Sequence, residues 1–326
     1  MNGAAMLDTL FPVRIERKAV AAQDVVTLDL VGADGGTLPS FDAGAHIDAE
    51  VRPGLVRQYS LCNDPAETHR YQIGVLRDPH SRGGSIAVHD ELAEGQLLRI
   101  GAPRNRFALV PAQRSLLLAG GIGITPILCM AERLARDGAA FEMHYCTRSA
   151  SRTAFAERIA AARWAGQARL HHDDGPAEQR LDLQRVLSAP LATTHLYVCG
   201  PRGFIGWVCD TARAAGWAPA QIHFEHFAGQ EPSGGAGDQA FEVRLARSGQ
   251  TIAVPRDCSV AVALHASGIE LPVSCEQGVC GTCLTRVIAG EPEHRDSYLT
   301  DEERSRNDQF LPCCSRSRSA CLVLDL

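Results

Sequence analysis

The sequence predicts three folded modules: an antiparallel β-barrel, a doubly wound α/β domain and a small α+β domain. Three observations predict them. Short alternating strands fill the chain up to about Pro111, apolar strands alternate with helical patterns from there to Ala228, and cysteines gather near the C-terminus. With about 100–200 residues in a typical domain, a chain of 326 residues has room for two or three.

The composition excludes some classes of function. The chain carries a formal net charge of −6, whereas a general nucleic-acid-binding protein has a basic balance. The first residues lack the basic segment and apolar core of a signal peptide. The most apolar stretch, Leu116–Ala131, is interrupted by glycines and a proline, so it does not supply the roughly 20 apolar residues of a membrane span. We expect a cytoplasmic protein that binds neither nucleic acid nor a membrane.

The first domain is expected to span residues 1–111. Its candidate strands are short, alternate apolar and polar residues, and are separated by glycine, proline and aspartate. This pattern is typical of a small antiparallel barrel. The candidates are Val25–Leu30, His46–Val51, Arg57–Leu61, Tyr71–Leu76 and Gln96–Ile100.

The second domain, residues 112–228, changes rhythm, because apolar strand candidates now alternate with helical patterns. The expected strands are Ser115–Ala119, Phe141–Cys146, Ala168–His172, His195–Cys199 and Ile222–Phe224. The expected helices are Pro126–Arg136, Thr153–Trp164, Leu183–Leu187 and Phe204–Ala215. Such alternation is typical of a parallel, doubly wound sheet.

A linker and a third domain complete the chain. Residues 229–237 are polar and glycine-rich and cannot bury a core, so we expect them to form the linker. The third domain, residues 238–326, opens with a hairpin pattern over Phe241–Leu245 and Thr251–Val254. A short helix candidate, Ser259–Ala266, precedes the cysteine cluster.

Three cysteines of the third domain have the spacing C-x4-C-x2-C: Cys275, Cys280 and Cys283. Two more, Cys313 and Cys314, follow later in the chain. Four thiolates with this spacing are the ligands of a plant-type 2Fe–2S cluster. A structural zinc site is the alternative, but zinc sites usually show paired C-x2–4-C segments, and only one such segment is present.

A candidate flavin-binding segment, Arg57-Gln58-Tyr59-Ser60, resembles the R-x-Y-S motif of the ferredoxin-reductase superfamily. An arginine fork binds phosphate, a tyrosine packs on an isoalloxazine ring, and a serine hydroxyl bonds a ring nitrogen. Gly83-Gly84-Ser85 leads into a helical pattern, and free amides at a helix start form an anion site. The alternative for this second segment is a plain loop in which Ser85 caps the helix.

A candidate nucleotide-binding turn, Gly120-Gly121-Ile122-Gly123-Ile124-Thr125-Pro126, follows the first strand of the second domain. Glycines at such a turn let the phosphates of a dinucleotide approach the backbone. The turn resembles the G-G-x-G-x-T-P signature of ferredoxin-reductase-type NAD(P) domains. Farther along, Cys199-Gly200-Pro201 ends a strand as in that family, which implies that Cys199 lies near the nicotinamide ring. Cys199 as a covalent nucleophile is the alternative, and no adjacent base is identifiable.

Two pairs of residues bear on the choice between NADH and NADPH. Arg148 and Ser149 follow the second strand of this domain and are placed to meet an adenosine phosphate. Asp173 and Asp174 would repel a 2′-phosphate if they lie near it, so we expect NADH. The preceding His171-His172 does not predict a metal site, because adjacent strand residues point to opposite faces.

The order of the three modules resembles the phthalate dioxygenase reductase and vanillate O-demethylase reductase family over essentially the whole chain. In that family the flavin is FMN, the nucleotide is NADH, and the partner is a terminal oxygenase with a Rieske cluster and a mononuclear iron. The resemblance implies a ferredoxin-like (β-grasp) third domain and, from Phe310-Leu311-Pro312-Cys313, Cys313 as the last cluster ligand. It also implies that Phe227 packs near the flavin; a buried position at the end of the sheet is the alternative.

The resemblance implies a role for each motif. The residues that it assigns are Arg57, Tyr59, Ser60, Gly83, Gly84 and Ser85 for FMN; Gly120 to Thr125 and Cys199 to Pro201 for NADH; and Cys275, Cys280, Cys283 and Cys313 for iron. The implied reaction is hydride transfer from NADH to the flavin, with Thr125 and Cys199 shaping the contact, and then single-electron transfer through the cluster. Three alternatives stay open: the same modules with FAD and NADPH in the service of another hydroxylase, a non-enzymatic iron–sulfur redox sensor, and a zinc-binding module appended to a flavoenzyme.

Overall fold

The computed structural model describes residues 10–79, 83–188, 190–227, 238–273, 278, 281–296 and 298–326 of the chain. The chain divides into two compact units, a large unit over Leu10–His226 and a C-terminal unit that begins at Phe227. The expected boundary between residues 111 and 112 falls inside the large unit and stays a prediction. The linker expected over residues 229–237 lies outside the described residues.

The first half of the large unit is an antiparallel β-barrel, as predicted. Its strands are β1 (Phe11–Ala22), β2 (Val25–Gly32), β3 (Ala45–Arg52), β4 (Leu55–Ser60), β5 (Arg70–Leu76), β6 (Leu97–Ile100) and β7 (Arg104–Asn105). They pair in the order β4-β3-β6-β1-β2-β5, with β7 on β3, and every pair is antiparallel. A bridge between Leu61 and Ile73 joins the end of β4 to β5 and closes the barrel. The helix α1 (Gly84–Asp90) lies between β5 and β6 in the chain.

The strand β1 was not predicted from the sequence. Of its twelve residues only Val13 and Ile15 are buried, and register shifts against β2 interrupt the strand twice. A strand that buries so few side chains shows no sustained alternation of apolar and polar residues, which is the signal that sequence analysis depends on.

The second half of the large unit is a parallel sheet, which confirms the predicted α/β domain. Its strands are β8 (Arg114–Gly120), β9 (Ala140–Thr147), β10 (Ala168–His172), β11 (Thr194–Cys199) and β12 (Ile222–Glu225). They lie in the order β10-β9-β8-β11-β12, and all pairs are parallel. A strand order that runs outward from β8 in both directions is the mark of a doubly wound sheet.

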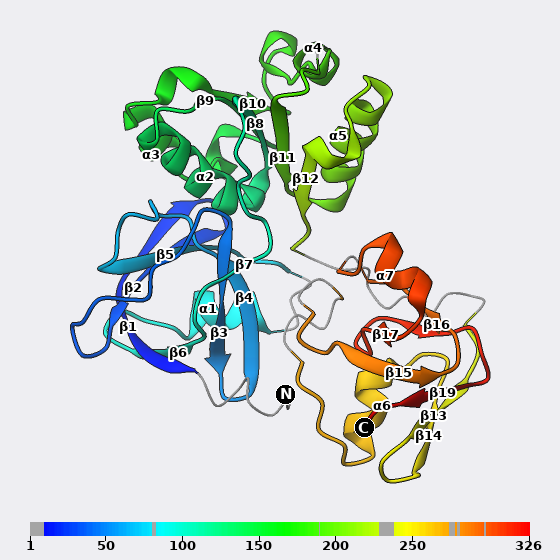
Figure 1. The fold of residues 1–326 in the computed structure, drawn as a ribbon. Coiled ribbons are helices and arrows are strands. Elements are labelled where there is room, and N and C mark those ends of the chain that lie inside the picture. The colour runs from blue at the N-terminus through cyan, green and yellow to red at the C-terminus, as the bar shows by residue number, and fades with distance from the viewer. Residues whose placement is uncertain are drawn as a thin grey trace. The chain divides into compact units, whose positions relative to one another are not determined.

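Helices cover both faces of this sheet (Figure 1). The helices α2 (Ile124–Arg136) and α3 (Ala156–Ala161) lie on one face, and α4 (Leu183–Leu187) and α5 (Arg202–Ala214) lie on the other. The helix expected over Thr153–Trp164 is shorter than predicted, because Phe155 has a left-handed φ of 61° and α3 begins only after it. The α2 face of the sheet and the barrel interior share one continuous apolar core.

The C-terminal unit is a small mixed sheet with helices, as predicted for a β-grasp domain. Its elements are β13 (Phe241–Leu245), β14 (Thr251–Val254), α6 (Val260–Ala266), β15 (Thr285–Ala289), β16 (Pro292–Glu293), α7 (Asp301–Arg306), β17 (Gln309–Phe310), β18 (Arg316–Ser317) and β19 (Cys321–Leu324). The main sheet has the order β14-β13-β19-β15-β17, in which β13 and β19 are parallel. The predicted hairpin of β13 and β14 is confirmed, and α6 packs into the same core.

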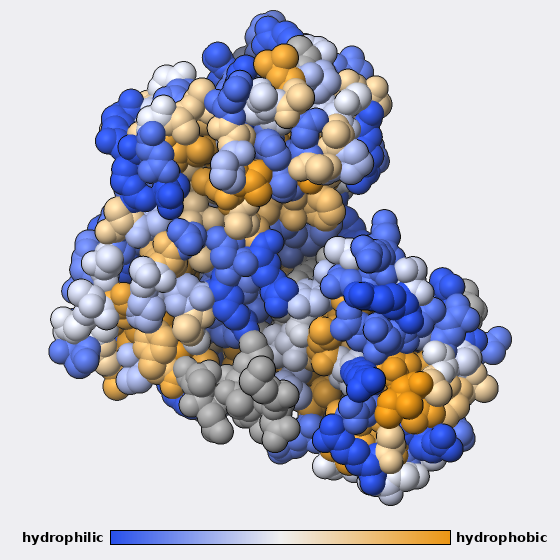
Figure 2. Space-filling view, in the orientation of Figure 1, coloured by the Kyte–Doolittle hydropathy of each residue, from blue (hydrophilic) through white to orange (hydrophobic). Residues whose placement is uncertain are grey.

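Hydrophobic residues reach the surface of both units in small groups among hydrophilic ones (Figure 2). In the C-terminal unit the exposed large apolar side chains include Val262, Val273, Leu284 and Ile288. Among the helices that the structure describes, none combines the length and the apolar character that a membrane span requires.

Candidate functional site

The two motif segments of the α/β domain pack against each other at the carboxyl edge of the sheet. After β8 the chain turns through a 3₁₀ helix, Gly121–Gly123, into α2, and Gly121 has a φ of 53°, which favours glycine. A Cβ on Gly123 would lie only 2.5 Å from the nitrogen of Gly200, and one on Gly120 would lie 3.1 Å from Cδ of Pro201. These glycines therefore let the loop after β8 contact the backbone of the loop after β11.

The same turn meets the barrel through Thr125. This side chain is 2% exposed, and its Oγ1 donates a hydrogen bond of 3.1 Å to the carbonyl of Ile122. Its methyl group faces Gly74 of β5, where a Cβ would lie 2.9 Å from Thr125 Cγ2. Pro126 follows in the first turn of α2, where a missing N–H costs no helical hydrogen bond. Gly74 is a contact residue that sequence reasoning missed.

The predicted flavin segments also adjoin. Arg57 on β4 lies against Gly84, because a Cβ on Gly84 would come within 2.7 Å of Arg57 Cγ. Gly83 has a φ of 87° and is the N-cap residue of α1, so the alternative in which Ser85 caps this helix is wrong. The Ser85 hydroxyl instead accepts a hydrogen bond of 3.1 Å from the backbone N–H of Asp78. Tyr59 lies two residues after Arg57, and burial raises the pKa of its phenol.

Glu225 joins the two halves of the large unit, and sequence reasoning missed it. It ends β12 in register with Cys199 of β11, and its Oε2 accepts a hydrogen bond of 3.5 Å from the Ser60 hydroxyl. Burial raises the pKa of the Glu225 carboxyl to about 8. The only local signal was an acidic residue that directly follows the apolar strand Ile222–Phe224.

Cys199 is fully buried beside this carboxyl. Burial, with a smaller contribution from Glu225, raises the pKa of its thiol well above the usual value. A thiol that stays protonated is a poor nucleophile, so the geometry does not favour the covalent alternative. Cys199 instead contributes a small apolar surface to the junction of the two motif loops.

Arg148 and Asp173 lie on neighbouring loops at the same edge of the sheet. The Asp173 N–H donates a hydrogen bond of 3.0 Å to the Thr147 carbonyl, and the Asp174 N–H donates one of 3.2 Å to the Arg148 carbonyl. The side chains of Arg148 and Asp173 are exposed. The adjacent histidines have different partners, since His171 stacks on His144 while His172 contacts Thr147.

Two of the four predicted cluster ligands lie in the described part of the C-terminal unit. Cys283 and Cys313 are buried in one apolar cluster with Leu299, Leu311 and Cys314. Cys275 and Cys280 lie outside the described residues. Gly281 has a φ of 70°, and a Cβ there would overlap the ring of Tyr298, so the loop requires glycine at this position. The buried thiols of Cys283 and Cys313 fit the donor set of a 2Fe–2S cluster.

Phe227 begins the C-terminal unit, and 37% of its side chain is exposed. The alternative, in which Phe227 is buried at the end of the parallel sheet, is therefore wrong. Its packing near a flavin stays a prediction.

Comparison with known proteins agrees with this architecture. Residues 243–318 match the 2Fe–2S iron–sulfur cluster binding domain, and residues 104–222 match the N-terminal domain of dimethylamine monooxygenase subunit DmmA-like proteins. The chain is 54% identical to a vanillate O-demethylase oxidoreductase of Pseudomonas sp., over 97% of this chain and 100% of that one.

Two solved structures are similar over nearly the whole chain. Phthalate dioxygenase reductase, described as a modular structure for electron transfer from pyridine nucleotides to 2Fe–2S, is 37% identical with a TM-score of 0.78 and 100% coverage of both chains. An intact type IV self-sufficient cytochrome P450 monooxygenase is 37% identical with a TM-score of 0.82, covering 97% of this chain and 41% of that one.

A barrel, a doubly wound nucleotide-binding sheet and a cluster-binding domain on one chain define an iron–sulfur flavoprotein oxidoreductase. The chain belongs to the family of oxygenase reductases that includes vanillate O-demethylase oxidoreductase and phthalate dioxygenase reductase. The predicted family and the predicted three-module fold are both confirmed.

Proposed function

We propose that this chain is the NADH-dependent reductase component of a two-component oxygenase, with FMN and a 2Fe–2S cluster as its resident cofactors. The observation that carries the proposal is the contact between Ser60 of the flavin segment and Glu225, the register neighbour of Cys199. This contact supports the proposal, because Ser60 belongs to the predicted flavin segment and Cys199 to the predicted nicotinamide segment. FMN accepts the two electrons of a hydride and releases them singly, as a one-electron cluster requires.

The barrel residues would hold FMN. Arg57 and the backbone amides of Gly84 and Ser85 would bind its phosphate. The position of the Arg57 side chain directly against Gly84 supports this assignment. Tyr59 would contact the ring system, and the Ser60 hydroxyl, which donates to Glu225, would accept a hydrogen bond from a ring nitrogen.

The α/β domain would hold NADH. Gly120, Gly121 and Gly123, with Pro126 in the first turn of α2, would bind the pyrophosphate through backbone amides at the start of α2. Gly200 and Pro201 form the facing loop, and Thr125 and Cys199 would orient the nicotinamide toward the flavin. Arg148 and Asp173 would meet the adenosine end. Phe227 would pack near the flavin.

Glu225 would hold a proton next to the flavin. With a pKa of about 8, its carboxyl is mostly neutral at pH 7 and does not place a buried negative charge beside the reacting groups. It would thereby orient the Ser60 hydroxyl without repelling the hydride.

The C-terminal domain would receive the electrons. Cys275, Cys280, Cys283 and Cys313 are the proposed cluster ligands. Leu284, directly after Cys283, is 38% exposed, so the ligand segment reaches a surface that a partner can contact. The proposed domains are residues 1–111, 112–228 and 238–326, joined by residues 229–237, in a cytoplasmic protein.

The proposed partner is a terminal oxygenase of the Rieske type. The names of the relatives support it, since one belongs to a vanillate O-demethylase and the other to a phthalate dioxygenase. The similarity to part of a cytochrome P450 monooxygenase shows that a reductase of this fold also occurs with haem. NADH-driven turnover of a purified Rieske oxygenase, compared with reduction of a purified P450, separates the two partners.

An anaerobic titration of the purified protein with NADH tests the reductase function. We expect the flavin absorption to bleach and a rhombic EPR signal of a reduced 2Fe–2S cluster to appear. Extraction and chromatography of the flavin would identify FMN. Flavin bleaching without a paramagnetic cluster, in protein that contains zinc and no iron, would contradict the electron-splitting function.

A further inference from the structure

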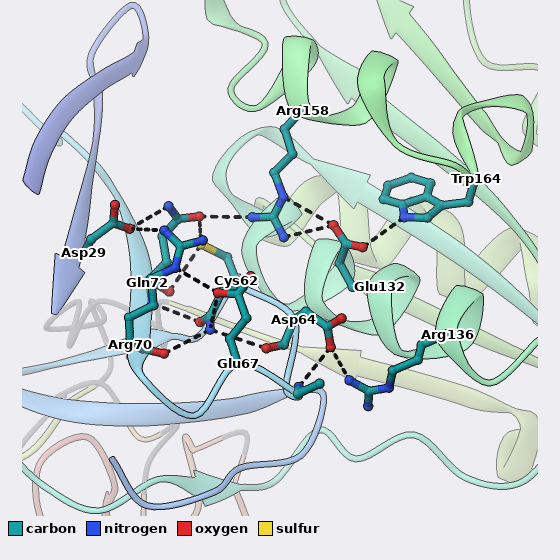
Figure 3. Close-up of polar contacts among 12 residues, drawn as sticks. Asp29, Cys62, Asp64, Glu67, Arg70, Gln72, Glu132, Arg136, Arg158 and Trp164 are labelled. Carbon is teal, nitrogen blue, oxygen red and sulfur yellow. Dashed lines mark hydrogen bonds and ion pairs between the residues drawn. The ribbon is translucent and has the colours of Figure 1, made fainter. Parts of the chain in front are cut away.

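A polar network crosses from the α/β domain to the barrel on the side of the large unit where α3 meets β5 (Figure 3). Arg158 of α3 donates from Nη1 to Oε1 of Gln72 on β5 at 3.0 Å. The same guanidinium donates to Oε1 of Glu132 on α2, from Nη2 at 3.0 Å and from Nε at 3.3 Å. The other oxygen of Glu132 accepts a hydrogen bond of 3.1 Å from the Trp164 indole.

The network continues into the barrel. The amide nitrogen of Gln72 donates to Oδ1 of Asp29 at 2.7 Å, and Asp29 pairs with Arg70 at 3.1 Å. Charges along this path alternate in sign, from Glu132 through Arg158 to Asp29 and Arg70. The side chains of Asp29, Glu132 and Arg158 are only 10%, 19% and 28% exposed. Loss of one partner from such a partly buried pair leaves the other charge unpaired, which costs more than the loss of an exposed surface pair.

The network ends next to the predicted nicotinamide turn. Gln72 and Gly74 lie two residues apart on β5, so their side-chain positions share one face of the strand, about 7 Å apart. Gly74 contacts the methyl of Thr125, and the ring of Phe155, the residue before α3, lies 3.2 Å from the position of a Gly74 Cβ. One face of β5 therefore carries both the bond to Arg158 and the contact with Thr125.

We propose that Arg158 is a positioning residue for hydride transfer. Its bond to Gln72 fixes the α/β domain against β5, and the contact between Gly74 and Thr125 then sets how closely the nicotinamide turn approaches the flavin barrel. Glu132 and Trp164 hold the guanidinium in place from the α/β side. The inference rests on the proposed function, because it assigns this geometry to the step between NADH and flavin.

The expected effect of removing Arg158 follows from the geometry. A displacement of about 1 Å between reacting groups can cost up to about a hundredfold in rate. In Arg158→Met, which keeps much of the side-chain length, we expect the rate constant of flavin reduction by NADH to fall by about tenfold to a hundredfold in anaerobic stopped-flow measurements. The affinity for NADH should change by less than about threefold, because Arg158 touches none of the predicted nucleotide-binding residues. Arg158→Lys should recover part of the rate.

Asp42→Asn is the matched control. Asp42 also pairs with an arginine of α2, Arg133, at 3.4 Å, but its side chain is 81% exposed. An exposed pair contributes little, so flavin reduction in this variant should stay within about twofold of the unsubstituted protein. Gln72→Met removes the same bond from the barrel side and should slow flavin reduction as Arg158→Met does, with a double variant no slower than either single one.

A second readout does not depend on turnover. Amide hydrogen exchange of the segments 70–76 and 120–127 should be faster in Arg158→Met than in Asp42→Asn, in the absence of NADH. Photochemical reduction should show unchanged electron transfer from flavin to cluster. The inference would be overturned if Arg158→Met and Asp42→Asn had equal flavin-reduction rates and equal hydrogen exchange. It would also be overturned if Arg158→Met slowed electron transfer from flavin to cluster as much as it slowed flavin reduction. Failure of NADH to bleach the unsubstituted protein would instead overturn the proposed function.

Discussion

Ser60 at the end of β4 donates a hydrogen bond of 3.5 Å to Glu225 at the end of β12. Ser60 comes from the barrel and Glu225 from the parallel sheet, so this contact joins the two predicted cofactor-binding modules of the large unit. Burial raises the pKa of the Glu225 carboxyl from 4.5 to about 8, so this contact is sensitive to pH near neutrality.

The first prediction concerns this carboxyl. The pKa of Glu225 is higher in the folded protein than in the unfolded chain, so folding favours the protonated carboxyl. The contribution of this carboxyl to stability is fully present below about pH 4.5 and is lost as the pH rises through about 8. The thermal unfolding midpoint should therefore fall across this window. Glu225→Gln should remove this contribution, while the exposed control Glu178→Gln should keep it. Superimposable pH profiles of Glu225→Gln and the unsubstituted protein would contradict the assignment.

The second prediction tests the nucleotide-binding turn. A Cβ on Gly123 would lie 2.5 Å from the Gly200 nitrogen, so Gly123→Ala must push the two loops apart. We expect NADH to reduce the flavin at least about tenfold more slowly, while dithionite still bleaches it fully. Gly206→Ala on α5 meets no atom within 4 Å and should leave the NADH reaction unchanged. Loss of flavin from Gly123→Ala would show that the turn supports the barrel instead.

The third prediction concerns Lys18, the single lysine of the chain. Its ammonium donates to the carbonyls of Val88, His89 and Leu92, at 2.9, 2.7 and 2.7 Å, at the C-terminal end of α1. Hydrogen bonds to charged groups contribute about 1.5–3 kcal/mol, and Lys18→Met leaves these carbonyls without this donor. We expect the free energy of unfolding in urea to fall by about 2 kcal/mol. Lys18→Arg, which keeps a charged donor, should lose less, and equal losses in both variants would contradict this expectation.

The fourth prediction separates two adjacent cysteines. Cys313 and Cys314 are both buried in the same cluster, and only Cys313 is a proposed ligand. Cys313→Ala should abolish the EPR signal and reduce the iron content, while Cys314→Ala should keep two irons per chain. The flavin should be reduced by NADH in both variants. Loss of iron from Cys314→Ala alone would exchange the two assignments.

The sequence by itself determined the order and type of the modules, because those signals are local. The bounds expected for β10, α4, β13 and β14 agree with the structure, since each is a short run with a regular apolar pattern. The glycine turns at Gly83 and Gly121 were also local, because a left-handed φ favours glycine whatever surrounds it. The spacing of Cys275, Cys280 and Cys283 is likewise a local signal that can be read directly from the sequence.

Only the tertiary structure decided which distant side chains meet. Glu225 lies 165 residues from Ser60, and Arg158 lies 86 residues from Gln72. No periodicity or spacing in the chain couples such positions, because their contact depends on how the barrel and the sheet pack together. Gly74 is the simplest case, because in the sequence it is only a glycine inside a strand. The tertiary structure explains it, since a Cβ there would meet the methyl of Thr125 and the ring of Phe155.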